Sequence, residues 1–203
     1  MSETTNAAED TARIRAEFTV EGALAGMRLD AALAGALDAF PDIEVEGKRC
    51  LDAGASTGGF TDVLLRRGAA HVAAVDVGHG QLVDALREEP RVGVYEGLNV
   101  RYMNPEDIGG QVELTVSDLS FISLTLVMEA LANATETGGD LVLMVKPQFE
   151  VGKHRIGRGG VVHEESARRE AVEKVQASAV SHGLRVMGME PSPLPGQDGN
   201  VEY

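Results

Sequence analysis

The sequence has 203 residues, 43% of them hydrophobic, and a formal net charge of −14 at neutral pH. This length can bury one substantial core, and the acidic balance argues against a protein that binds nucleic acid through a broad basic surface. A single cysteine, Cys50, excludes internal disulfides and cysteine-rich metal sites, and the lack of a long apolar run predicts a cytoplasmic protein with neither membrane partner nor metal.

The N-terminal part of the chain divides into an arm and a helix. Residues 1–20 show no hydrophobic periodicity and are predicted to form a disordered acidic arm. From Leu29 to Phe40, apolar residues recur at helical spacing, which predicts an amphipathic helix that Pro41 ends. We therefore assign residues 21–46 to this helix and a linker.

Between residues 47 and 203, apolar runs typical of strands alternate with segments typical of helices. Strands are expected at Arg49–Asp52, His71–Asp76, Arg91–Glu96, Glu113–Asp118, Asp140–Lys146 and Leu184–Glu190. Helices are expected at Gly59–Arg67, Gln81–Glu88, Ser123–Asn133 and Glu164–His182. The alternation predicts an α/β fold, with a doubly wound, mostly parallel sheet covered on both faces.

The segment after the first expected strand is rich in glycine, in the pattern D-x-G-x-x-x-G-G that starts at Asp52. Such a turn lets a ligand approach the backbone, and the helix that follows offers free N–H groups to a carboxylate or phosphate. Asp76 ends the next strand, where doubly wound folds place the carboxylate that binds ribose hydroxyls. These features indicate a nucleoside-cofactor site, and a turn that serves only strand–helix packing is the alternative.

The glycine spacing discriminates between cofactors. It differs from the dinucleotide fingerprint G-x-G-x-x-G, and a carboxylate at the turn, Asp52, would repel a pyrophosphate. The same carboxylate suits the ammonium and sulfonium groups of S-adenosylmethionine. The sequence therefore favours S-adenosylmethionine over NAD.

Two further expected strands end in charged residues, Asp118 and Lys146, at the edge where such folds bind ligands. A lysine that closes an apolar strand either emerges into the cleft or is paired, because burying an unpaired ammonium costs free energy. Beside Asp118, Lys146 would be suited to proton transfer, and a simple edge salt bridge is the other interpretation.

A local basic stretch, Lys153-His154-Arg155 with Arg158, lies among glycines in a predicted loop. A local patch of this kind can bind RNA on an acidic protein, with weaker electrostatic steering than a basic protein provides. Lys153, Arg155 and Arg158 are therefore candidate RNA-binding residues.

Five stretches carry, in order, a resemblance to a known family. They are LDAGASTGGFTDVLLRRGAAHVAAVDVGHGQL, SDLSFISL, LVLMVKPQFEVGK, GRGGVV and PSPLPGQDGNVEY. Across residues 47–203 the sequence resembles the TlyA family, whose members often carry the name hemolysin and which belongs with the FtsJ-like S-adenosylmethionine-dependent ribosomal RNA 2′-O-methyltransferases. The resemblance implies a class I, Rossmann-like methyltransferase fold, S-adenosylmethionine as cofactor, and ribosomal RNA or ribosomal subunits as partner.

The resemblance also implies catalytic residues. Enzymes of this kind use a Lys-Asp-Lys-Glu tetrad, whose last three members match Asp118, Lys146 and Glu202. Lys146 would help to remove the 2′-hydroxyl proton, and the two carboxylates would orient Lys146 and hold its charge state. Methyl transfer from a sulfonium is downhill, so the site mainly needs in-line positioning and a hydroxyl that can lose its proton.

The cofactor-binding residues implied by the resemblance lie on three strand ends. Asp76 would bind the ribose, and the segment from Glu96 to Asn99 would lie beside the adenine. Each could also be an ordinary turn residue. For the methionine end the resemblance gives Asp52, Gly54, Ser56, Thr57, Gly58 and Gly59.

The sequence departs from the family pattern at several positions. Ala32 stands where the first tetrad lysine belongs, and Arg28, one turn earlier, cannot act as a base because a guanidinium stays protonated. His79 replaces a usual tyrosine, and Gly97-Leu98 replaces a usual Arg-Thr pair. The family's S4-type RNA-binding domain is not seen before the helix, nor its last strand after GNVEY, which predicts an unfilled slot in the sheet.

Three functions therefore compete. The main prediction is a ribosomal RNA ribose 2′-O-methyltransferase. The second is an S-adenosylmethionine-binding, RNA-associated protein that methylates weakly or not at all, because Ala32 removes a tetrad lysine. The third is a membrane-active hemolysin, for which the sequence offers no basic amphipathic helix or apolar span. An NAD-linked oxidoreductase is disfavoured by the glycine spacing.

Overall fold

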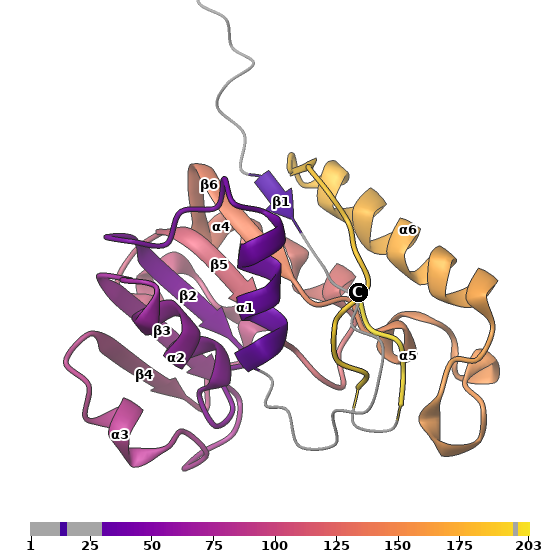
Figure 1. Ribbon diagram of the computed structural model, residues 1–203, viewed down its shortest axis with the longest axis horizontal. Helices are drawn as coiled ribbons and strands as arrows, with labels where there is room; N and C mark the ends of the chain where they lie inside the picture. The colour runs from indigo at the N-terminus through magenta and orange to yellow at the C-terminus, as the bar shows by residue number, and fades with distance from the viewer. Residues whose placement is uncertain (1–12, 16–29, 197–198) are drawn as a thin grey trace, which may run out of the picture.

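The computed structural model describes residues 13–15, 30–196 and 199–203 (Figure 1). The strands form one seven-stranded sheet in the order β4-β3-β2-β5-β6-β1-β7, and every paired neighbour runs parallel. The chain moves outward from β2 toward β4, then returns to β5 and moves outward on the other side. This is the doubly wound α/β arrangement, so the predicted fold class is confirmed.

Most elements lie, in order, where the sequence predicts them, but the strand Arg13–Arg15 and the helix Pro147–Glu150 were not expected. The last strand is shorter than predicted, and the helix expected at Ser123–Asn133 is α-helical only from Met128. The strands are β1 (Arg13–Arg15), β2 (Arg49–Ala53), β3 (His71–Asp76), β4 (Val92–Glu96), β5 (Val112–Ser117), β6 (Thr135–Leu143) and β7 (Arg185–Val186). The α-helices are α1 (Asp30–Ala39), α2 (Gly59–Arg66), α3 (Asp84–Arg87), α4 (Met128–Ala134), α5 (Pro147–Glu150) and α6 (Glu165–Ser181). Short 3₁₀ turns are η1 (Val100–Tyr102), η2 (Pro105–Ile108), η3 (Leu124–Leu126), η4 (Lys153–Arg155) and η5 (Arg158–Gly160).

The sheet is covered on both faces, which is why its central strands are near-continuous apolar runs. Alternate residues of each strand point to opposite faces. On one face Cys50 and Val72 pack in a core with α1 and α2, which lie in front of the sheet in Figure 1. On the other face Leu51 and Leu141 pack in a core with α4 and α6. Both cores end at the carboxyl edge of the strands, so the polar residues there meet at one rim.

Strand β6 differs from its predicted bounds, because it begins at Thr135 and ends at Leu143. An irregularity in its pairing with β5, between Val112 and Leu114, lets it start early. It ends early because the chain beyond it changes partner: Val145 and Tyr203 exchange backbone hydrogen bonds in both directions. The C-terminus therefore lies at the carboxyl edge of the sheet (Figure 1).

Strand β1 falls within the segment predicted to be a disordered arm, and for Arg13–Arg15 that prediction is wrong. These residues lie between β6 and β7 and pair in parallel with both, so their backbone groups find partners on each side. The strand occupies part of the sheet where the family resemblance had predicted an unfilled slot. The rest of the arm and Arg28 lie outside the described residues. Within the part of the chain that the structure describes, no helix is both long and apolar enough to cross a membrane.

Candidate functional site

The turn between β2 and α2 needs glycine at two positions. Gly54 has a φ of +95°, and a Cβ there would lie 2.8 Å from the carbonyl oxygen of Asp118. The turn thus lies directly against the loop that follows β5. Gly58, with φ +101°, precedes α2, and a Cβ there would meet the side chains of Leu82 and Leu86. The close approach of a backbone oxygen at Gly54 and of two leucine side chains at Gly58 explains the small residues that the sequence shows here.

Asp52 lies beneath this turn. Its side chain is fully buried, and Oδ2 accepts a hydrogen bond of 2.6 Å from the Thr61 hydroxyl on α2. Burial raises the pKa of Asp52 from 3.8 to about 7, against the lowering effect of Thr61. Oδ1 has no hydrogen-bond partner among the described residues. A buried acceptor of this kind costs free energy unless something donates to it, so the chemistry of the site fits a cationic ligand group at the turn.

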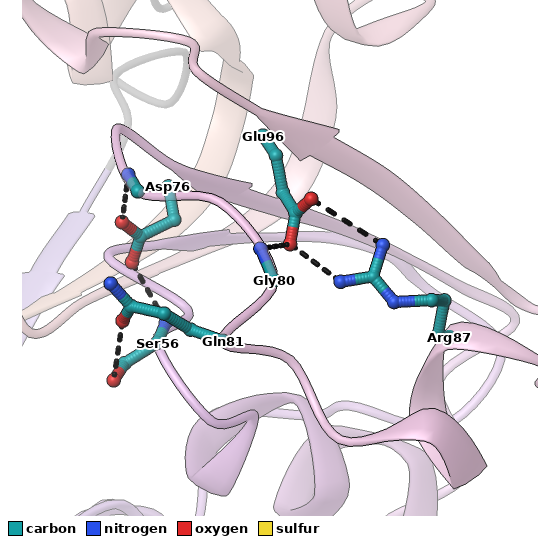
Figure 2. Close-up of polar contacts among 7 residues, drawn as sticks. Ser56, Asp76, Gly80, Gln81, Arg87 and Glu96 are labelled. Carbon is teal, nitrogen blue, oxygen red and sulfur yellow. Dashed lines mark hydrogen bonds and ion pairs between the residues drawn. The ribbon is translucent and has the colours of Figure 1, made fainter.

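Asp76 connects the ends of β2 and β3. Its Oδ2 accepts from the backbone N–H of Ser56 at 2.8 Å, and its Oδ1 accepts from the N–H of Gly78 at 2.7 Å (Figure 2). Ser56 has a φ of +48°, and its hydroxyl contacts Gln81 Oε1 at 3.3 Å. Each carboxylate oxygen has a second lone pair, so Asp76 can still accept hydrogen bonds from ribose hydroxyls.

Glu96 lies opposite Asp76 in the register of β3 and β4, but its carboxylate is engaged differently. Arg87 on α3 reaches Oε1 at 2.6 Å, and the N–H of Gly80 donates to the same oxygen at 2.9 Å (Figure 2). The hydrogen bond from Arg87 lowers the pKa of Glu96. Glu96 therefore holds the loop after β3 in place. Asn99 is exposed and accepts a hydrogen bond from the backbone of Arg101 at the start of η1.

A groove borders the turn on its outer side. Its lining residues are Thr57, Gly58, Gly59, Asp62, Val83, Ala85 and Leu86. The groove includes three residues predicted to bind the methionine end of a cofactor, but not Asp76, Glu96 or Asn99. The structure thus divides the predicted cofactor residues between the groove and the adjoining strand ends.

Asp118, Lys146 and Glu202 meet at the ends of β5 and β6. Lys146 is 8% exposed, and its Nζ lies 2.7 Å from Asp118 Oδ1 and 3.0 Å from the hydroxyl of Ser120. Burial raises the pKa of Glu202, while nearby Lys146 and a 3.1 Å hydrogen bond from Gln148 lower it. Lys146 is therefore paired within a buried charge cluster at the rim, an arrangement that fits both the proton-transfer interpretation and the edge salt bridge.

Ala32, the position of the missing lysine, lies on α1 and is 3% exposed. It borders an apolar cavity with Phe60, Met144 and Tyr203, and the last two are close along the chain to Lys146 and Glu202. None of the described residues that line this cavity carries a positive charge. Within the described ranges, no group of His, Cys, Asp and Glu side chains could hold a metal ion.

The candidate RNA-binding residues lie in the loop between α5 and α6. Lys153 and Arg158 are exposed, whereas Arg155 is ion-paired with Glu170 and lies 3.8 Å from Glu164. Asn200 fixes this loop, since its Oδ1 accepts from the N–H of Val162 at 2.9 Å and its Nδ2 donates to Gly160 at 3.0 Å. The motifs GRGGVV and GNVEY are thereby brought together.

Two aromatic side chains beside the charge cluster were not among the predicted site residues. Phe121 is 91% exposed and has a φ of +64°, which is rare for a bulky residue. Its ring centroid lies 5.3 Å from that of Phe149, with the planes tilted by 50°. Phe121 lies in the motif SDLSFISL and Phe149 in VKPQFE, but the sequence does not indicate that either is exposed. An apolar side chain next to a strand is normally predicted to lie in the core.

Three comparisons with known proteins bear on this arrangement. The sequence profile described as FtsJ-like methyltransferase matches residues 32–203. The chain is 57% identical over 171 residues to the 16S/23S rRNA (cytidine-2′-O)-methyltransferase TlyA of Mycobacterium tuberculosis, covering 84% of this chain and 63% of that protein. It is 35% identical to the 23S rRNA (cytidine-2′-O)-methyltransferase TlyA of Campylobacter jejuni, over 79% of this chain and 62% of that protein.

A solved structure from Streptococcus thermophilus that carries the name hemolysin is also similar. It has a TM-score of 0.83 and 45% identity, and the match covers 90% of this chain and 66% of that one. The chain thus spans a little under two thirds of the length of the two curated relatives. The predicted resemblance to the TlyA family is confirmed by these matches.

Proposed function

Because the chain belongs to the FtsJ-like methyltransferase family, we propose that it transfers a methyl group from S-adenosylmethionine to a ribose 2′-hydroxyl of ribosomal RNA. The observation that carries this proposal is the meeting of Asp118, Lys146 and Glu202 beside the glycine turn. The substrate follows from the relatives named as rRNA cytidine-2′-O-methyltransferases. Action on ribosomes would place the protein in the cytoplasm.

The residues at the turn fit this cofactor. Asp52 offers an unpartnered buried carboxylate oxygen on the side of the positive groups, and Asp76 offers acceptors for ribose hydroxyls. Gly54, Ser56, Thr57, Gly58 and Gly59 would border the methionine end, with Asn99 toward the adenine. When bound, the cofactor supplies an electrophilic methyl group on a sulfonium. Glu96 takes the indirect role of holding the loop between β3 and α3.

Lys146 is the group proposed to receive the 2′-hydroxyl proton. To receive this proton, Lys146 has to enter the step as a neutral amine. The proton then forms an ammonium at Nζ, 2.7 Å from Asp118 Oδ1 and near Glu202. Ser120 contacts the same Nζ and is exposed, so it marks the side from which the hydroxyl approaches. Removing the proton as the carbon–oxygen bond forms is general base catalysis.

The RNA would be held by stacking and by phosphate contacts. An exposed ring such as Phe121, supported by Phe149, offers a face on which an unstacked base can lie beside the charge cluster. Lys153 and Arg158 are exposed cations on the adjoining loop. Arg155, engaged by Glu170, would instead hold that loop against α6.

A cofactor-binding protein that does not methylate is the second candidate, and Ala32 is the observation that favours it. At this position an apolar cavity replaces the lysine that the family pattern expects. Transfer of labelled methyl from S-adenosylmethionine to ribosomal RNA, followed by mapping of the modified ribose, separates the two. Label on a 2′-oxygen supports the methyltransferase, whereas calorimetric binding of S-adenosylmethionine without transfer to either subunit's RNA supports the second candidate.

A further inference from the structure

Glu150 is a buried carboxylate that the proposed chemistry does not use. It is the last residue of α5 and is 6% exposed. We propose that Glu150 is a positioning residue that fixes the acceptor loop, residues 118–124, against the segment that follows Lys146. This inference rests on the proposed function, because it assigns Glu150 a role in holding the same active site.

The contacts of Glu150 join three separate parts of the chain. Its Oε2 accepts a hydrogen bond from the Ser123 hydroxyl, and its Oε1 accepts from the backbone N–H of Leu124 at 2.6 Å. From α6, Lys174 Nζ donates to the Glu150 carbonyl oxygen at 3.0 Å and lies 3.5 Å from Oε2. Both carboxylate oxygens are thus used, and the Glu150 side chain has no exposed surface to spare for solvent.

The end of the acceptor loop that Glu150 holds lies just after the residues that matter for the reaction. Ser123 and Leu124 follow Phe121, whose left-handed backbone persists only where the surroundings determine it. Glu150 also follows Phe149, the ring partner of Phe121. A single carboxylate therefore fixes the loop end and its aromatic support together, and through them the approach to Lys146.

The two oxygens of a carboxylate suit the two donors of the loop, and this predicts which substitution can replace it. In Glu150→Gln the amide oxygen can accept from Leu124, while the amide nitrogen can donate to the Ser123 oxygen. In Glu150→Ala the Leu124 N–H loses its partner, and the Ser123 hydroxyl keeps only its contacts with Thr125. Glu150→Gln should therefore preserve the loop, and Glu150→Ala should release it.

The kinetic test compares Glu150→Ala, Glu150→Gln and the control Glu173→Gln, which removes an exposed carboxylate from α6. We expect Glu150→Ala to lower kcat about 100-fold, because misplacement by about 1 Å costs that much. S-adenosylmethionine affinity should stay within about twofold, and both other variants within about threefold of the parent in kcat. Parallel losses of kcat, cofactor affinity and Tm in Glu150→Ala would show a folding role only and overturn the proposal.

A reporter that does not need catalysis completes the test. The sequence contains no tryptophan, so Phe121→Trp places a single tryptophan, which can be excited selectively, in the acceptor loop. Combined with Glu150→Ala it should show faster acrylamide quenching and lower anisotropy, and combined with Glu150→Gln or Glu173→Gln it should not. An unchanged signal in all three backgrounds overturns the positioning role. The two proposals can also fail separately. If Glu150→Ala changes the Phe121→Trp signal while the unsubstituted chain transfers no methyl group, the positioning role stands and the proposed function is refuted.

Discussion

The two halves of the site are held by different kinds of contact. At the ends of β2, β3 and β4, carboxylates bind backbone groups close in sequence, as with Asp76 and Ser56, 20 residues apart, or Glu96 and Gly80, 16 apart. At the ends of β5 and β6, side chains join distant segments, such as Gln148 and Glu202, 54 residues apart. After their proposed roles, we call the group at β2, β3 and β4 the cofactor half and the group at β5 and β6 the acceptor half. The cofactor half thus joins segments closer in sequence than the acceptor half does.

The sharpest way to separate the halves is Lys146→Ala. We expect methyl transfer to fall about 10³-fold, within the range for loss of a general base. S-adenosylmethionine affinity should change little, since Lys146 contacts Asp118 and Ser120 rather than the glycine turn. Single-turnover rates and calorimetry measure the two effects. Equal methylation by the variant and the parent would show that the charge cluster has another purpose.

Stability against pH tests the burial of Asp52 in the cofactor half. Its pKa is about 7 in the folded protein and near 3.8 when unfolded, so the folded state holds the proton between these values. The resulting stability is complete below about pH 4 and is lost as pH rises through 7.

Asp52→Asn keeps an acceptor for Thr61 but removes the titration. Urea unfolding should therefore show the parent losing on the order of 3 kcal/mol more than the variant between pH 4.5 and 7.5. Parallel pH profiles for the two proteins would mean that Asp52 is ionised in the folded state.

The halves touch where Gly54 meets Asp118, and Gly54→Ala should disturb both. A Cβ there would lie 2.8 Å from a backbone oxygen, at a φ that disfavours side chains. We expect the free energy of unfolding to fall by about 2 kcal/mol. Gly110→Ala is the matched control, because its φ is +112° but nothing lies within 4 Å of a Cβ. If both substitutions lower the free energy of unfolding equally in urea, backbone strain alone explains the loss. The close approach of Gly54 to Asp118 would then contribute nothing to stability.

Asp76→Ala should affect the cofactor half alone and gives the smallest of these effects. Loss of a charged acceptor for ribose hydroxyls should weaken S-adenosylmethionine binding about tenfold. The rate at saturating cofactor should stay within about threefold of the parent. Glu96→Gln serves as comparison, since Glu96 is engaged by Arg87 and Gly80 and should matter less. A larger effect from Glu96→Gln in calorimetry would reverse the assigned roles.

The sequence predicts the sheet well because its signal is local. Buried parallel strands are continuous apolar runs, and the rule that ligands bind at their carboxyl ends picks out Asp76, Asp118 and Lys146 without further information. Glu202 is different, since no strand pattern points to it and only the family resemblance assigned it. Its approach to Lys146 results from Tyr203 pairing with Val145, a contact across the fold.

The sequence could not predict which partner each polar side chain would contact. Nothing local shows that Asp52 turns under α2 to Thr61, or that Arg87 engages Glu96. The exposure of Phe121 follows from a left-handed backbone at a non-glycine residue, which propensity rules count against. The strand at Arg13–Arg15 escaped notice because a strand this short carries too few residues for a period to be read.

The uniformly parallel sheet also sets the order in which the proposed activity would arise during folding. Parallel neighbours cannot be joined by a tight hairpin, so each pairing has to wait for a crossover segment to collapse. Topologies dominated by such distant pairings fold slowly, on roughly the millisecond-to-second scale. Lys146 and Glu202 come together only after β6 has paired in the sheet. The rate at which methyl transfer appears during refolding would therefore report the rate at which the sheet is completed.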